Sequence, residues 1–157
     1  MATSQIRTKM ITRATFALSL APGGVGLANG SSRQSDLITN SNNYPGALVY
    51  LKIKSGASNP TANTTYEVFL VRKDSTISDD NAGASDAAIT IENSNLLGSI
   101  VVTADAAKHF YGVFDTAHLG PLGPTWGIAI RNNTGQAVDT TESNHVKGYS
   151  YYVPELQ

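Results

Sequence analysis

The sequence predicts an all-β protein: a single-domain antiparallel β-sandwich, jelly-roll-like, of about eight strands, with an extended N-terminal arm. Three observations support this prediction. Short segments alternate apolar and polar residues with a period of two, as strands with one buried face do. Gly, Pro and Asn separate these segments, and no segment has the period of an amphipathic helix. We therefore divide the 157 residues into an arm, residues 1–13, and a sandwich domain, residues 14–157.

The first half of the chain contains four candidate strands, at residues 12–20, 32–38, 47–54 and 65–73. The third places one apolar set on one face and a mixed set on the other. The apolar set is Ala47, Val49, Leu51 and Ile53, and the mixed set is Leu48, Tyr50, Lys52 and Lys54. The fourth is apolar on both faces and is the strongest strand signal in the chain.

The second half continues the pattern, with turn residues between the segments. Residues 87–91 fit a short strand or a turn of helix, and four further strands are expected at residues 96–103, 108–115, 125–131 and 145–153. In the segment 108–115, alternation places His109, Tyr111 and Val113 on one face of the strand and Phe110 and Phe114 on the other face. The Pro and Gly residues of the segment 119–124 exclude a helix there.

Composition excludes several function classes. The net charge of −1 creates no global field that would attract nucleic acid or an anionic membrane, so we expect neither partner. The absence of cysteine excludes disulfides, thiol nucleophiles and thiolate metal sites. No apolar run approaches the roughly 18 residues of a membrane span, and the N-terminal residues lack the apolar run of a secretory signal.

The first thirteen residues are basic and contain no acidic residue. We interpret Gln5, Arg7, Lys9 and Arg13 as a candidate subunit-contact arm that lies against an acidic neighbour, and a solubilising tail is the alternative.

No catalytic or cofactor motif is present, so we expect a protein without enzymatic activity and without a cofactor. The glycines Gly24 and Gly26 lack the spacing and the following helix of a dinucleotide-binding loop. No Gly-x-Ser-x-Gly elbow marks a serine hydrolase. The histidines His109, His118 and His145 are too far apart in the sequence to form a metal motif.

Two binding sites are weighed as alternatives. A loop rich in carboxylates has ligands that suit Ca²⁺ but lacks EF-hand spacing, so solvated side chains and no metal are expected; its residues are Asp79, Asp80, Asn81 and Asp86. A set of aromatic residues fits a sugar-stacking platform, although core and interface packing is favoured; its residues are Trp126, Tyr149, Tyr151 and Tyr152.

Residues 31–72 resemble a group of small virion proteins from tailed bacteriophages and prophages. The resemblance is carried by Arg-Gln-Ser-Asp-Leu-Ile-Thr-Asn at 33–40 and by Pro-Thr-Ala-Asn at 60–63, with the strands 47–54 and 65–72. It implies a structural protein of the particle, favouring a head decoration (cement) protein that stabilises the shell through non-covalent contacts.

The same resemblance implies partners and a location. The partners are the major capsid protein or other virion subunits, together with further copies of the chain, with a trimer favoured. The location is the outer surface of the capsid, after synthesis in the host cytoplasm. A tail-, neck- or fibre-associated virion protein and a carbohydrate-binding (receptor-binding) module are the alternatives.

Overall fold

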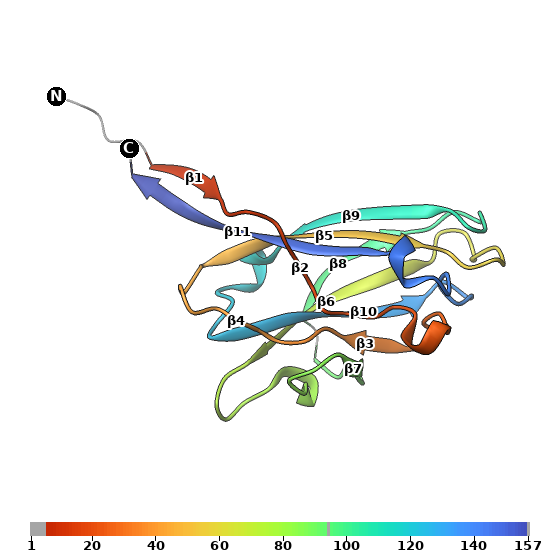
Figure 1. Ribbon diagram of the computed structural model, residues 1–157, viewed down its shortest axis with the longest axis horizontal. Helices are drawn as coiled ribbons and strands as arrows, with labels where there is room; N and C mark the ends of the chain where they lie inside the picture. The colour runs from red at the N-terminus through yellow and green to blue at the C-terminus, as the bar shows by residue number, and fades with distance from the viewer. Residues whose placement is uncertain (1–5, 94, 157) are drawn as a thin grey trace.

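The computed structural model describes residues 6–93 and 95–156, which form two antiparallel β-sheets with a shared apolar core between them (Figure 1). The described residues contain eleven strands and four short 3-10 turns, and none of them is in an α-helix. The predicted all-β sandwich is therefore confirmed. More strands are present than the eight expected, because several are only two or three residues long.

The strands divide into two sheets, which we call sheet A and sheet B. Sheet A has the order β1 (Ile6–Met10), β11 (Val146–Leu156), β5 (Gly46–Lys54) and β9 (His109–Asp115), and β2 (Ala14–Thr15) also pairs with β11. Sheet B has the order β7 (Ala87–Ala88), β3 (Ser32–Gln34), β10 (Thr125–Asn133), β6 (Thr65–Lys73) and β8 (Leu96–Val101), and β4 (Ile38–Thr39) also pairs with β10.

The core lies between the sheets and follows the predicted alternation. The apolar set of β5, Ala47, Val49, Leu51 and Ile53, is buried. From sheet B, β10 contributes Trp126, Ile128 and Ile130 to the same cluster. Fully burying a side chain of this size contributes roughly 1.5–3 kcal/mol, so the inner faces of the two sheets supply most of the stability.

The segment predicted as one strand at residues 12–20 connects the two sheets instead. Within this segment, only the two residues of β2 pair with β11. The following residues, 16–21, cross the open edge of the sandwich, and we call them the crossing segment. Phe16 N–H still donates to Lys147 in sheet A, whereas the carbonyl of Ala17 accepts from Asp36 N–H on the side of sheet B. Phe16, Leu18 and Leu20 are buried as the period of two predicts, because the crossing segment stays extended.

Sheet B has its outer face covered by the chain itself. Phe69 and Val71 of β6 and Ala129 of β10 point away from the main core and form a second cluster with Ala82. Leu37, Ile89 and Ile91 pack against this cluster. The long β6–β8 connection therefore covers sheet B, which explains why β6 is apolar on both faces.

Strand β1 pairs with the end of β11, and the two form a ribbon that extends beyond the sandwich (Figure 1). We call this pair the terminal ribbon, Ile6–Met10 with Tyr152–Leu156. Residues 6–10 of the predicted arm are thus paired within the chain, and residues 1–5 lie outside the described part.

Candidate functional site

The outer face of sheet A carries apolar and aromatic side chains, two of which are largely open to solvent. In the register of β5 and β9, Tyr50 lies opposite Val113 and Lys52 lies opposite Tyr111. Directly opposed residues share a face, so these four side chains form one surface. Tyr111 is 69% exposed and Val113 is 62% exposed. Leu48 precedes Tyr50 by two positions on β5 and so shares this face. We call the apolar and aromatic members of the face, Leu48, Tyr50, Tyr111 and Val113, the sheet A patch.

Arg13 lies over one aromatic ring of this patch. Its guanidinium carbon is 5.1 Å from the centroid of the Tyr50 ring, within the range of a cation–π contact. Gly148 of β11 lies opposite Tyr50 and has no side chain, which leaves room for the guanidinium. A Cβ atom on Gly148 would lie 2.6 Å from Arg13 Nε. Arg13 therefore belongs to the outer surface of sheet A.

The other predicted arm residues lie elsewhere. Lys9 is in the terminal ribbon, where its Nζ is 3.1 Å from Glu155 Oε1 in an exposed ion pair. Arg7 lies opposite Glu155 in the same ribbon, and Gln5 is outside the described residues. Lys9 and Arg13 thus have different partners, a carboxylate and an aromatic ring.

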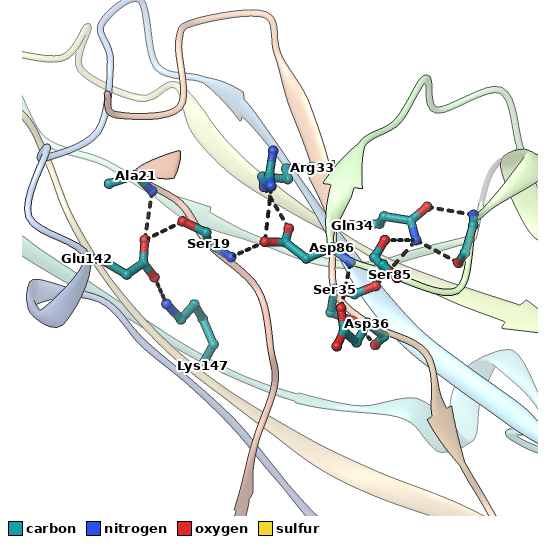
Figure 2. A network of polar contacts seen from close by, with 11 residues as sticks. Ser19, Ala21, Arg33, Gln34, Ser35, Asp36, Ser85, Asp86, Glu142 and Lys147 are labelled. Carbon is teal, nitrogen blue, oxygen red and sulfur yellow. Dashed lines mark hydrogen bonds and ion pairs between the residues drawn. The ribbon is translucent and has the colours of Figure 1, made fainter. Parts of the chain in front are cut away.

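A cleft of about 670 Å³ lies at the open edge of the sandwich, where the crossing segment passes between the sheets. Two carboxylates hold this segment (Figure 2). Asp86 Oδ2 accepts from Ser19 N–H at 3.1 Å, and Asp86 Oδ1 lies 2.6 Å from Arg33 Nε. Glu142 Oε2 accepts from Ser19 Oγ at 3.0 Å and from Ala21 N–H at 2.7 Å.

Glu142 is also paired with Lys147, whose side chain is almost fully buried. Burial acts to raise the pKa of Glu142. The hydrogen bonds from Lys147, Ala21 and Ser19, together with the positive charge of Lys147, outweigh burial and lower this pKa overall. A carboxylate with a lowered pKa is a weak general base, so it activates the Ser19 hydroxyl poorly. The cleft is therefore better suited to fixing the crossing segment than to proton transfer.

His145 lines the same cleft and is fully engaged. Its Nδ1 accepts from Lys54 N–H at 3.2 Å, and its Nε2–H donates to the Asp139 carbonyl at 3.0 Å. Burial lowers the pKa of His145, which favours the neutral ring that this pair of bonds requires. The ring therefore joins β5 to the loop that precedes β11.

The carboxylates of the acidic loop point to separate partners. Asp79 accepts from Arg72 N–H, whereas Asp80 Oδ1 accepts from the N–H groups of Glu92 and Asn93. Asp86 lies with Arg33. Within residues 6–93 and 95–156, no three His, Asp or Glu side chains converge as metal ligands would.

The aromatic set that was weighed as a sugar-stacking platform does not form one, and Trp126 and Tyr151 lie in the core, as the favoured interpretation expects. Trp126 is 0% exposed and donates from Nε1 to the buried Tyr151 hydroxyl at 2.9 Å. Tyr149 packs edge-on against Trp126, and Tyr152 lies apart, donating its hydroxyl to Asp115 Oδ1 at 2.8 Å. The exposed aromatic ring is Tyr111 instead. Strand alternation places Tyr111 and Phe110 on different faces of the strand, but the sequence does not reveal which of the two faces stays uncovered.

Comparison with known proteins gives no relatives: no family model matches the chain, and neither a curated protein nor a solved structure is similar to it. Among the described residues, no helix is long and apolar enough to cross a membrane.

Proposed function

We propose that this chain is a structural protein of a phage particle, a head decoration (cement) protein that binds the capsid shell and stabilises it through non-covalent contacts. The particle comes from the resemblance of residues 31–72, and one structural observation supports the binding role: the chain covers the outer face of sheet B with its own residues and leaves Tyr111 and Val113 of sheet A exposed. A contiguous exposed apolar surface marks an interaction site more often than it marks chance exposure.

The connectivity supports the same proposal. Along the chain, β2, β5, β9 and β11 lie in sheet A, while β3, β6, β8 and β10 lie in sheet B. We infer from the neighbour orders β2-β11-β5-β9 and β3-β10-β6-β8 that the fold is a jelly roll of two Greek keys. Viral capsid proteins and lectins both use this architecture, so the fold agrees with the proposal without deciding it.

The proposed partners are the major capsid protein or other virion subunits, together with further copies of the chain, favouring a trimer. The proposed location is the outer surface of the capsid. A modest contact per subunit is sufficient there, because many copies bind the same lattice and multivalency strengthens retention. The projecting terminal ribbon supports this arrangement, since an isolated two-stranded ribbon is only marginally stable in water.

Retention on purified particles tests the proposal. The double variant Tyr111→Ser/Val113→Ser should lose about tenfold in retention, because two exposed anchors leave the contact. The matched control is Val25→Ser/Ile77→Ser, which removes two residues of similar exposure, 68% and 71%, away from the patch. Equal retention of the double variant and the wild type, or absence of the chain from particles, would overturn the proposal.

The exposed ring of Tyr111 supports a second candidate, a carbohydrate-binding (receptor-binding) module. Binding of the purified protein to a glycan array that is lost in Tyr111→Ser would favour it. Copy number by quantitative mass spectrometry of particles narrows the virion location. On the order of hundreds of copies fits a head lattice or a tail tube, whereas a handful fits a neck, baseplate or fibre protein.

A further inference from the structure

We propose that the outer face of sheet A binds an acidic surface with an apolar centre on a different protein, and not a second copy of this chain across a two-fold axis. The inference rests on the proposed function, because it names the chemistry of the partner that the sheet A patch contacts. It is carried by the distribution of unpaired cations.

Most cations of the described chain have a carboxylate partner. Seven ion pairs join Lys or Arg to Asp or Glu; their cations are Lys9, Arg33, Lys54, Arg72, Lys108, Arg131 and Lys147. Among the described side chains, Arg13, Lys52 and Lys73 have no such partner. Two of these three, Arg13 and Lys52, lie on the sheet A face.

These two cations flank the apolar residues of the patch. Arg13 stacks on Tyr50, and Lys52 follows two positions along β5 on the same face, opposite Tyr111. The nearest carboxylate in the register is Asp115, opposite Leu48, and it is already engaged by the Tyr152 hydroxyl and by Ala117 N–H. Asp115 keeps its charge but forms no ion pair with either cation, so the face presents Arg13 and Lys52 as unpaired positive charges beside apolar side chains.

A two-fold axis that passes between the two cations would place Arg13 of one copy near Lys52 of the other. Like charges brought together in an interface cost several kcal/mol by order of magnitude, whereas carboxylates on a partner would be favourable. The two cations thus disfavour such a two-fold contact and favour an acidic neighbour.

Nucleic acid fits the face less well. Strong backbone binding neutralises about six to ten phosphates, and only two free cations are present here. Leu48 and Val113 would also gain nothing from a phosphate backbone, whereas they suit the apolar core of a protein interface. A protein surface with carboxylates around an apolar centre uses all of these side chains.

Charge reversal on the face provides the test. Retention of Arg13→Glu/Lys52→Glu on purified particles should fall at least tenfold relative to wild type, and wild-type retention should weaken with rising salt. Lys73→Glu is the matched control, since it reverses an unpaired cation on sheet B, and it should behave as wild type. Unchanged retention of the double reversal, with loss in Tyr111→Ser/Val113→Ser, would overturn this inference and leave the proposed function intact.

Measurements on the free protein separate the two proposals further. Anilinonaphthalene sulfonate, an aromatic anion, should bind the wild type and Lys73→Glu equally and bind Arg13→Glu/Lys52→Glu at least tenfold more weakly. Equal binding by all three would contradict the inferred chemistry, whether or not particles carry the chain. A dimer in sedimentation that is abolished by Tyr111→Ser/Val113→Ser, or tight binding of oligo-dT lost in the charge reversal, would overturn the choice of partner.

Discussion

At the scale of single residues, the core of the sandwich depends on an aromatic hydrogen bond as well as on packing. Trp126 Nε1 donates to the Tyr151 hydroxyl at 2.9 Å in a buried environment. The Phe16 and Tyr149 rings meet the indole nearly edge-on, at interplanar angles of 87° and 82°. The indole is thus held on three sides, with its one polar atom satisfied.

Removing the acceptor of this bond should be costly. Tyr151→Phe leaves a buried indole N–H without a partner, so the free energy of unfolding should fall by about 1–3 kcal/mol in urea denaturation. Tyr149→Phe is the matched control, because the Tyr149 hydroxyl has no hydrogen-bond partner among the described residues, and it should change stability by less than about 0.5 kcal/mol. Equal effects of the two variants would show that the bond contributes nothing specific.

His145 should make the fold sensitive to mild acid. Burial lowers its pKa in the native state below the ordinary value of 6.5. Above that value the ring is neutral in both states. As pH falls below about 6.5, the unfolded chain binds a proton that the native ring resists, so stability decreases by at most about 1.4 kcal/mol per pH unit for this one proton.

A proton NMR titration of the histidine rings checks this expectation. The ring of His145 should titrate below 6.5, and urea unfolding between pH 7.5 and 5.5 should lose most of its pH dependence in His145→Gln. His118→Gln provides the control, since removing this exposed ring should leave the shifted signal of His145 in place. A native pKa of His145 at or above 6.5 would contradict the account.

At the scale of elements, the crossing segment, residues 16–21, is a connection that side-chain carboxylates hold in place of a strand ladder. Its backbone is held by Glu142 and Asp86, which belong to different elements. The bonds from Ser19 and Ala21 replace the ladder that an ordinary strand would make. The charged residues of the cleft thus stabilise the edge where the two sheets meet.

Glu142→Gln should therefore destabilise the protein by about 1–3 kcal/mol, because Lys147 keeps its buried charge and loses its counterion. Partial exposure of Glu142 keeps this loss below that of a fully buried pair. Glu155→Gln is the control, since it removes the carboxylate of the exposed Lys9–Glu155 pair and should cost at most about 0.5 kcal/mol. Denaturant unfolding compares the two, and a larger loss in Glu155→Gln would contradict this reading of the cleft.

Long strands could be predicted from the sequence because each is a long run of strand-forming residues bounded by turn residues. Strand β6 spans Thr65–Lys73, the bounds predicted for it, and β5 begins one residue earlier than predicted. Strand β11 was expected to end at Val153, before Pro154, but it continues to Leu156. Ile11 N–H donates to Tyr151, so the pair Thr8–Pro154 falls at a position that needs no proline N–H.

At the scale of the whole molecule, the two sheets differ in what covers them. The β6–β8 connection packs on sheet B through Ala82, Ile89 and Ile91, and no described segment does this for the sheet A patch. The candidate surface could be only half predicted for this reason. Alternation placed Tyr111 and Val113 on one face of a strand, but long-range packing decides which face a distant loop covers.

The arm residues illustrate the same limit. Their basic character is evident in the sequence, yet Lys9 and Arg13 contact different elements because β1 ends at Met10 and the chain then turns onto sheet A. The sequence does not reveal the role of Gly148, since that role depends on the register of β11 with β5. Pairing between distant strands therefore creates the site.

Hydroxyl-radical footprinting of the chain, free and bound to purified particles, tests the central claim most directly. Binding through the outer face of sheet A predicts that Tyr111 and Val113 become protected on the particle, while Val25 and Ile77 keep the reactivity that they have in the free protein. Unchanged labelling of Tyr111 together with protection of Val25 or Ile77 would contradict the claim, because the particle would then contact a different face of the sandwich.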